Sequence, residues 1–186
     1  IPFAGVAGIV AKDASDGMVN LPEELEAKDL AQKTRIYDAN GNLIASIYDQ
    51  NRINVPLTQI SRKMVKSIVA IEDYRFYQHG ALDLKGTLRA FLTNQAQGGA
   101  VQGGSSITQQ MVKQTLLYQA ESDAEQAAAT EESYARKIRE LRYAIAFEKN
   151  HSKDWILERY LNIVYFGDGA FGVQSAARHF FSKNAK

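Results

Sequence analysis

Residues 61–80 read SRKMVKSIVAIEDYRFYQHG, and this stretch predicts a helical fold. Its apolar side chains recur at the 3.6-residue period of an α-helix: Met64, Val65, Ile68, Val69 and Ile71. We expect this helix to end near His79 and Gly80, because glycine suits the left-handed residue that closes many helices. Glu72 and Asp73 directly follow the apolar run.

Further helices are expected downstream, each from a capping residue or an apolar stripe. They start at Asp83, with Leu84, Leu88, Phe91 and Leu92 on one face; at Ser106, whose S-x-x-Q capping pattern opens a helix to about Tyr118; near Tyr134, with Ile138, Leu141 and Ile145; at Ser152; and near Val173. Gln95–Gly104 has the composition of a mobile loop. Residues 119–132 form either an acidic surface loop or an exposed helical insertion.

The segment before these helices predicts a linker and a hairpin. Ile1–Ala11 is apolar but too short to span a bilayer, which takes about 20 residues. It is either the outer end of a membrane helix or an ordinary terminus, and we interpret residues 1–33 as a juxtamembrane linker. Two β-branched and aromatic runs, Thr34–Asp38 and Leu43–Asp49, flank an Asn-Gly pair and predict a β-hairpin. The expected fold is mainly α, with this small N-terminal hairpin.

Composition excludes several classes of site and partner. The 186 residues include no cysteine, which excludes disulfides, thiolate metal sites and a Cys nucleophile. The formal net charge is +1, but residues 62–120 and 133–186 carry net charges of +4 and +5, with an acidic patch between them. The two basic segments favour a cleft for an anionic ligand. The absence of a polybasic run argues against a nucleic-acid partner.

Glu72 is a candidate general base. A carboxylate at the C-terminal end of a buried helix meets the negative end of the helix dipole, and both the dipole and burial favour its protonated form. Such a group suits proton abstraction. The alternative is a helix-end carboxylate that pairs with Arg75 or Lys66.

The start of the Ser106 helix is a second candidate site. Gly103 and Gly104 lead into hydroxyl and amide side chains, and the N–H groups of a helix start bind anions such as pyrophosphate. Lys113 lies one turn beyond Gln109 and adds a positive charge. The alternative is an ordinary capped helix start.

Arg136, Lys137 and Glu140 form a third candidate group. They share one helical face because they are three and four residues apart. The carboxylate can orient the two cations, hold a divalent metal or stabilise positive charge. The alternative is a solvated ion-pair face, which contributes little.

Taken together, these segments resemble the peptidoglycan glycosyltransferase domain of class A penicillin-binding proteins, glycosyltransferase family 51. Five blocks recur in the family's order within Thr34–Lys186. They are Glu72-Asp73-x-x-Phe76-x-x-His79-Gly80; Gly104-Ser105-Ser106-Ile107-Thr108-Gln109-Gln110-x-x-Lys113; Arg136-Lys137-x-x-Glu140; Lys153-x-x-Ile156-Leu157-x-x-Tyr160-Leu161-Asn162; and Gly172-Val173-x-x-Ala176-Ala177.

The resemblance implies a lysozyme-like, two-lobed helical domain over residues 34–186. It implies an inverting transfer that polymerises lipid II into β-1,4 glycan strands and releases undecaprenyl pyrophosphate. It further implies a location at the extracytoplasmic face of the cell membrane, a single-span anchor of which Ile1–Ala11 is a remnant, and a transpeptidase domain in the full-length protein. A moenomycin-type inhibitor is expected to compete for the donor site.

The same resemblance assigns roles to residues. Glu72 is the base, Asp73 its acidic neighbour and Glu140 the second catalytic carboxylate. Lys113, Arg136, Lys137, Arg139 and a divalent cation near Glu140, Mg²⁺ or Mn²⁺, stabilise the pyrophosphate. The sugars are expected near Arg75, His79, Arg89, Ser105 and Gln109. An inverting pair leaves room for the acceptor, so the two glutamates should lie farther apart than the roughly 5 Å of retaining pairs.

The chain departs from the family pattern in several places. Ser106 stands where threonine is usual, and it keeps the hydroxyl. The stretch from Lys113 to Arg136 is longer than usual, and Glu132 stands where the family often has an arginine that contacts phosphate or sugar. Phe180 and Ser182 replace the common Tyr and Gly. Because the sequence ends at Lys186, we expect the family's last C-terminal helices to be absent.

Two other functions fit parts of the sequence. A lysozyme-like muramidase or lytic transglycosylase has the same fold class, but it needs a proton donor for a sugar leaving group, whereas Arg136–Glu140 is rich in cations. A non-catalytic scaffold that binds lipid II is compatible with Glu132 and the acidic insertion. The presence of both Glu72 and Glu140 favours catalysis over that scaffold.

Overall fold

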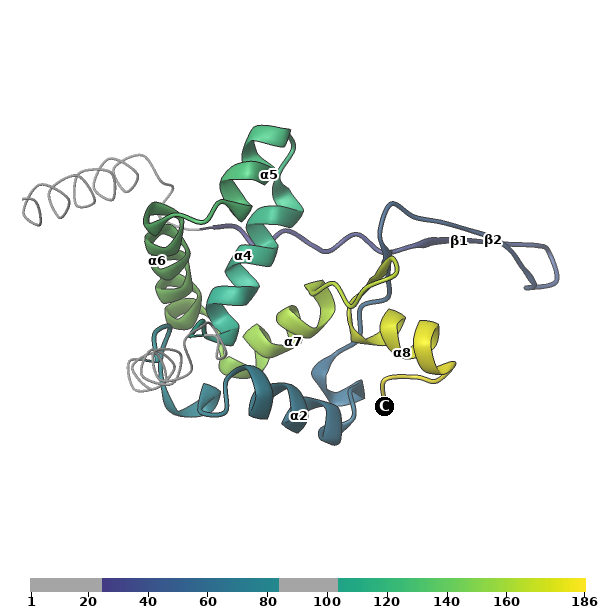
Figure 1. Ribbon diagram of the computed structural model, residues 1–186. Helices are drawn as coiled ribbons and strands as arrows, with labels where there is room; N and C mark the ends of the chain where they lie inside the picture. Colours follow the sequence, from purple (N-terminus) through teal and green to yellow (C-terminus); the bar gives the residue numbers. More distant parts are fainter. Residues whose placement is uncertain (1–24, 84–103) are drawn as a thin grey trace, which may run out of the picture.

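Helix α4 (Ile107–Gln119) lies at the centre of the helical body in the computed structural model, which describes residues 25–83 and 104–186 (Figure 1). It packs against three later helices: α5 (Asp123–Thr130), α6 (Tyr134–Asn150) and α7 (Lys153–Ile163). The apolar side of α4 is completely buried at Ile107, Met111 and Val112. Burial of each such side chain contributes about 1.5–3 kcal/mol, which holds these helices together.

Serine side chains cap the helices at the positions that the sequence predicted. The Oγ of Ser106 accepts a hydrogen bond from the backbone N–H of Gln109 (3.3 Å), and Ser152 caps α7 in the same way. Each bond satisfies one of the free N–H groups at a helix start. The predicted boundaries at these two serines are confirmed, and so is the final helix, α8 (Val173–Phe181).

The acidic segment forms a helix rather than a loop. Helix α5 begins with a reciprocal capping box between Ser122 and Glu125, which satisfies two backbone donors. Most of its residues are exposed, and Ala129 packs inward. Of the two alternatives left open for residues 119–132, the exposed helical insertion is confirmed.

Helix α2 (Arg62–Glu72) carries most of the predicted apolar stripe. Four side chains are partly buried against the core: Met64, Val65, Ile68 and Val69. Ile71 is 79% exposed, so the prediction that it belongs to the buried stripe is wrong. The helix lies along one edge of the molecule and packs inward through one side only (Figure 1).

The prediction that α2 continues to Gly80 is also wrong, because the helix ends at Glu72. Asp73 leaves the helical conformation, with φ at −161°. Its carboxylate instead accepts hydrogen bonds from the backbone N–H of Ile107 (3.2 Å) and from the ring of His79 (2.6 Å). These bonds join the end of α2 to the start of α4. A single 3₁₀ turn, η2 (Phe76–Gln78), follows.

The predicted hairpin is confirmed. Strands β1 (Thr34–Tyr37) and β2 (Leu43–Ile47) pair antiparallel and extend away from the helices (Figure 1). The turn is held by Asp38, whose carboxylate accepts from the backbone N–H groups of Asn40 (2.9 Å) and Asn42 (2.7 Å). Hydrogen bonds to the carboxylate lower the pKa of Asp38, and the bond from the Asn42 side chain has the largest effect.

A short parallel pair, β3 (Asn51–Arg52) with β4 (Ala170–Phe171), joins the chain before α2 to the loop before α8. Arg52 is 1% exposed, and its Nε donates to the carbonyl of Asn162 near the end of α7 (2.9 Å). Gly172 lies against the same carbonyl, with φ at +76°. A Cβ at Gly172 would lie 2.7 Å from that oxygen, so only glycine fits this contact.

The mainly α, lysozyme-like fold with a small hairpin is confirmed, and residues 25–33 have no regular secondary structure. The structure describes no helix that is both long and apolar enough to cross a bilayer within residues 25–83 and 104–186. Some predictions lie outside the described residues: the apolar segment Ile1–Ala11, most of linker 1–33, the helix after Asp83, and all but the last residue of the loop Gln95–Gly104.

Candidate active site

The candidate residues converge on a cavity of about 350 Å³ where the end of α2, the first turns of α4 and the start of α6 meet. Its lining is polar and charged: Glu72, Ser105, Gln109, Gln110, Lys113, Gln114, Lys137 and Glu140. Of these, all but Gln110 and Gln114 were predicted as site residues. The structure therefore brings two candidate carboxylates and two candidate lysines into one space.

Glu72 is the last residue of α2, and one of its oxygens is held by a neutral donor. The Nε2 of Gln110 donates to Oε2 of Glu72 (2.9 Å), and the Oε1 of Gln110 accepts from the hydroxyl of Tyr160 (3.0 Å). Burial raises the pKa of Tyr160, and the negative charge of Glu72 raises it further, so the hydroxyl remains a donor. Within the described residues neither Arg75 nor Lys66 forms an ion pair with Glu72, so the structural alternative is not observed.

Glu140 has a different environment, since it is 1% exposed and lies between two cations. Arg136 donates to Oε1, and Nζ of Lys137 lies 3.2 Å from Oε2. Arg136 is itself buried, but the side chain of Lys137 is 48% exposed and also donates to Oγ of Ser105 (3.0 Å). The Arg136–Glu140 pair is therefore fixed inside the domain, while Lys137 presents its charge to the cavity.

The start of α4 is capped rather than open. The backbone N–H of Ile107 donates to Asp73, and that of Gln109 donates to Ser106. The side chain of Gln109 also donates, from Nε2, to the carbonyl of Ala81 (3.1 Å). Since these groups are engaged, positive charge for an anion in this cavity comes from side chains, Lys113 and Lys137, more than from the helix start.

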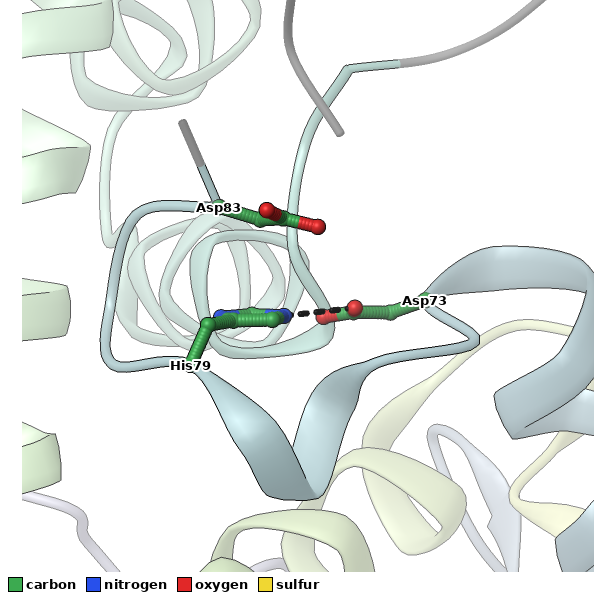
Figure 2. Close-up of side chains that lie close together, drawn as sticks. All are labelled: Asp73, His79 and Asp83. Atoms are coloured by element: carbon green, nitrogen blue, oxygen red, sulfur yellow. Dashed lines mark hydrogen bonds and ion pairs between the residues drawn. The ribbon is translucent and has the colours of Figure 1, made fainter. Parts of the chain in front are cut away.

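Asp73, His79 and Asp83 lie close together on the loop that follows Glu72 in the sequence (Figure 2). Nε2 of His79 lies 2.6 Å from Oδ1 of Asp73, and Nδ1 lies 2.5 Å from the carbonyl oxygen of Gly80. Asp83 forms an ion pair with Arg75. The predicted residues Asp73, Arg75 and His79 thus belong to two bonded pairs on this loop, Asp73–His79 and Arg75–Asp83, and they do not line the cavity.

One more predicted cation, Arg139, lies apart from the cavity group. Arg139 points toward α5, where its guanidinium donates to the carbonyl of Ala128 (2.6 Å), and it lines a separate cavity of about 240 Å³ between α4, α5 and α6. Arg89 lies outside the described residues. Glu132, which replaces a frequent arginine, is exposed just before α6.

Comparison with known proteins identifies the family of this chain. A family model described as Transglycosylase matches residues 40–186. The chain belongs to the transglycosylase family. Penicillin-binding protein 1F of Bacillus subtilis is 38% identical over 157 residues, 84% of this chain and 20% of that protein. Penicillin-binding protein 1A of Escherichia coli is 40% identical over 165 residues, 88% of this chain and 18% of that protein.

A third relative, penicillin-binding protein 4 of Bacillus subtilis, is 36% identical over 170 residues, which cover 89% of this chain and 26% of that protein. The sequence therefore spans about a fifth to a quarter of the length of these relatives. The five sequence blocks fall within the residues that the family model matches. The identified family is the one that those blocks predicted.

The contacts of this transglycosylase domain do not fit a resident metal at Glu140. Both oxygens of Glu140 face cations, and a divalent ion in the same place would be repelled by Arg136 and Lys137. Asp73, His79 and Asp83 place three ligand atoms within 4.8 Å of one another, but each residue already has a partner. Their side chains are therefore engaged with other groups of the protein.

Three residues that line or contact the site were not predicted from the sequence: Gln110, Gln114 and Tyr160. A signal for the glutamines exists, because residues 109, 110, 113 and 114 are polar at helical spacing on the side of α4 opposite its buried apolar residues. Tyr160 gave no such signal, since an aromatic residue on a core helix is interpreted as packing. Only its distance to Gln110 shows the link.

Proposed function

We propose that this transglycosylase domain is a peptidoglycan glycosyltransferase. It polymerises lipid II into β-1,4 glycan strands by inverting transfer and releases undecaprenyl pyrophosphate. One observation carries the proposal: a single cavity contains a carboxylate with one oxygen held by an amide, Glu72, and a pair of lysines, Lys113 and Lys137, supported by Glu140. That combination suits proton abstraction beside an anionic leaving group.

Glu72 is the base in this proposal. Oε2 is bonded to Gln110, and within the described residues no hydrogen bond is formed to Oε1. Oε1 can therefore accept the proton of the acceptor 4-hydroxyl as that oxygen attacks the anomeric carbon. Attack opposite the pyrophosphate inverts that carbon, so an α-linked donor gives a β-linked product.

The leaving pyrophosphate needs charge stabilisation and no general acid. Lys113 and Lys137 line the cavity and can approach its oxygens. Glu140 orients Lys137, and Arg136 holds Glu140 from behind. Arg136 is thus a positioning residue, while the lysines make the contact.

A divalent cation, Mg²⁺ or Mn²⁺, is proposed as an ion that arrives with the pyrophosphate. Hard cations prefer oxygen ligands, and the leaving group brings several of its own. Such an ion would be held by the oxygens of the substrate, because both oxygens of Glu140 face Arg136 and Lys137. This places less demand on the protein than a preformed metal site, which the contacts of Glu140 do not favour.

The remaining partners follow from the same substrate. Lipid II is anchored in a membrane, so we propose that the domain works at the extracytoplasmic face of the cell membrane, held there by a single-span anchor. The relatives are penicillin-binding proteins several times longer than this sequence, and we propose that a transpeptidase domain accompanies this one. A moenomycin-type phosphoglycolipid should compete for the cation side of the cavity.

Incubation of the domain with lipid II and Mg²⁺ in detergent tests the proposal. We expect glycan polymer from the wild-type protein, none from Glu72→Gln, and inhibition by moenomycin. A muramidase would instead clear a suspension of purified cell wall. A scaffold would bind lipid II without turnover, and either result would overturn the proposal.

A further inference from the structure

We infer that Tyr160 is a positioning residue for the catalytic base, acting through the side-chain amide of Gln110 on Glu72. The inference rests on the proposed function, because it assigns a role toward the same base. It concerns a tyrosine on α7 that neither lines the cavity nor faces the substrate.

The three residues form a hydrogen-bonded chain across three helices. The hydroxyl of Tyr160, on α7, donates to Oε1 of Gln110, on α4, at 3.0 Å. Nε2 of Gln110 donates to Oε2 of Glu72, at the end of α2, at 2.9 Å. Tyr160 is 3% exposed, so the chain begins in the core and ends at the cavity.

The chemistry of the amide gives this chain a direction. A glutamine side chain accepts at its oxygen and donates at its nitrogen, so an amide with its oxygen on the Tyr160 hydroxyl must present its nitrogen to Glu72. The reverse orientation would set an amide oxygen against a carboxylate. Burial raises the pKa of Tyr160, which keeps the phenol protonated and the orientation fixed.

A hydrogen bond to one oxygen of the Glu72 carboxylate also sets the direction of its other oxygen. With Oε2 held by Gln110, rotation of the Glu72 carboxylate is restricted, and Oε1 keeps one direction toward the cavity. A reacting group that leaves its attack geometry loses rate even when substrate binds equally well. Loss of the Tyr160 hydroxyl should therefore lower kcat and leave KM unchanged, since Tyr160 makes no contact in the cavity.

Tyr160→Phe tests this with a matched control. It removes one hydroxyl from a side chain that is 3% exposed, and Tyr143→Phe on α6 does the same to another 3% exposed side chain. Within the described residues no hydrogen bond joins the Tyr143 hydroxyl to Glu72. We expect kcat for lipid II polymerisation to fall about tenfold in Tyr160→Phe, with KM within about twofold, and neither to change in Tyr143→Phe. Equal kcat in the two variants would overturn the inference.

A double-mutant cycle separates positioning from general loosening of the core. If Tyr160 acts only through Gln110, adding Tyr160→Phe to Gln110→Leu should lower kcat no further. Full additivity of the two losses would contradict the inference. Melting temperatures of all variants are measured alongside, and we expect Tyr160→Phe and Tyr143→Phe to differ by no more than about 2 °C.

An NMR measurement tests the hydrogen bond between Tyr160 and Gln110 without relying on catalysis. In the ¹⁵N-labelled protein, the side-chain amide signal of Gln110, assigned by its loss in Gln110→Leu, should shift in Tyr160→Phe and stay in place in Tyr143→Phe. A signal that does not respond to Tyr160→Phe would overturn the inference even if the wild-type protein polymerises lipid II. If the shift occurs but the wild-type protein makes no polymer, the proposed function fails while the hydrogen-bonded chain stands.

Discussion

Glu72 and Glu140 face the same cavity, yet their surroundings are opposite. Glu72 ends a helix, with one oxygen on the neutral amide of Gln110. Glu140 lies inside α6, and both of its oxygens face cations, Arg136 and Lys137. A carboxylate with an oxygen left over can accept a proton, whereas one fully engaged by cations can only hold them in place. Two glutamates can therefore have different roles, proton acceptor and holder of cations, because they differ in their position on the helix and in their neighbours.

The largest effect is expected at Glu72. Glu72→Gln keeps the size of the side chain and removes the basic oxygen, so kcat for lipid II polymerisation should fall about 10²- to 10⁴-fold, the range for loss of a general base. The melting temperature should change by no more than about 2 °C, because Glu72 forms no ion pair with any described residue. Polymerisation within tenfold of wild type in a gel or chromatographic assay would assign the base to another group.

Glu140→Gln should lower both stability and activity. Removing one partner of a buried ion pair leaves Arg136 without its counterion, which costs about 3–5 kcal/mol in the free energy of unfolding. Polymerisation should fall about 10- to 100-fold as Lys137 loses its orientation. Denaturant unfolding measures the first effect and initial rates the second.

A paired variant separates these two effects at Glu140. Arg136→Met with Glu140→Leu replaces the buried ion pair by apolar side chains, so we expect stability to recover toward wild type while activity stays low. Recovery of full activity in this variant would show that the carboxylate has only a structural role.

Much of this comparison could be predicted from sequence, and one part could not. The 3.6-residue stripe and the serine caps predicted the helices, since their causes are local. The end of α2 was predicted wrongly because Asp73 bonds to Ile107, far along the chain. The cavity residue Gln110 and its hydrogen-bond partner Tyr160 were missed for the same reason: their roles depend on contacts between helices that no local pattern encodes.

The position of Arg139 likewise depends on a contact between helices that could not be predicted from the sequence. On a helical wheel Arg139 lies beside Arg136 but nearly opposite Lys137, and the structure directs it toward the α5 insertion, where its guanidinium donates to the carbonyl of Ala128. The insertion is longer than the family pattern, so its helix supplied a partner that the resemblance did not predict. Residues carried over from a family pattern depend on neighbours that the pattern leaves out.

Lys137→Met should affect binding more than folding. Its side chain is 48% exposed, and Glu140 keeps its buried partner Arg136, so the loss of stability should be small. Loss of its charge from the cavity should raise KM for lipid II about tenfold. It should also weaken the dependence of KM on salt. A matched change at exposed Lys149 of α6, Lys149→Met, should leave both unchanged.

The smallest effect is expected at Ser105. Its hydroxyl accepts from Lys137 at 3.0 Å, and a hydrogen bond to a charged group contributes about 1.5 kcal/mol. Ser105→Ala should therefore raise KM by less than about tenfold and should have no further effect in Lys137→Met. Additive changes in the double variant would show that Ser105 meets the substrate directly.

The division of labour between the two sides of the cavity is tested most directly by measuring the affinity for fluorescent lipid II and the polymerisation rate in Glu72→Gln and Lys137→Met. We expect Glu72→Gln to bind lipid II within about twofold of wild type and to make no polymer, whereas Lys137→Met should bind about tenfold more weakly and still make polymer at saturating substrate. Loss of binding in Glu72→Gln, with full affinity in Lys137→Met, would contradict this expectation.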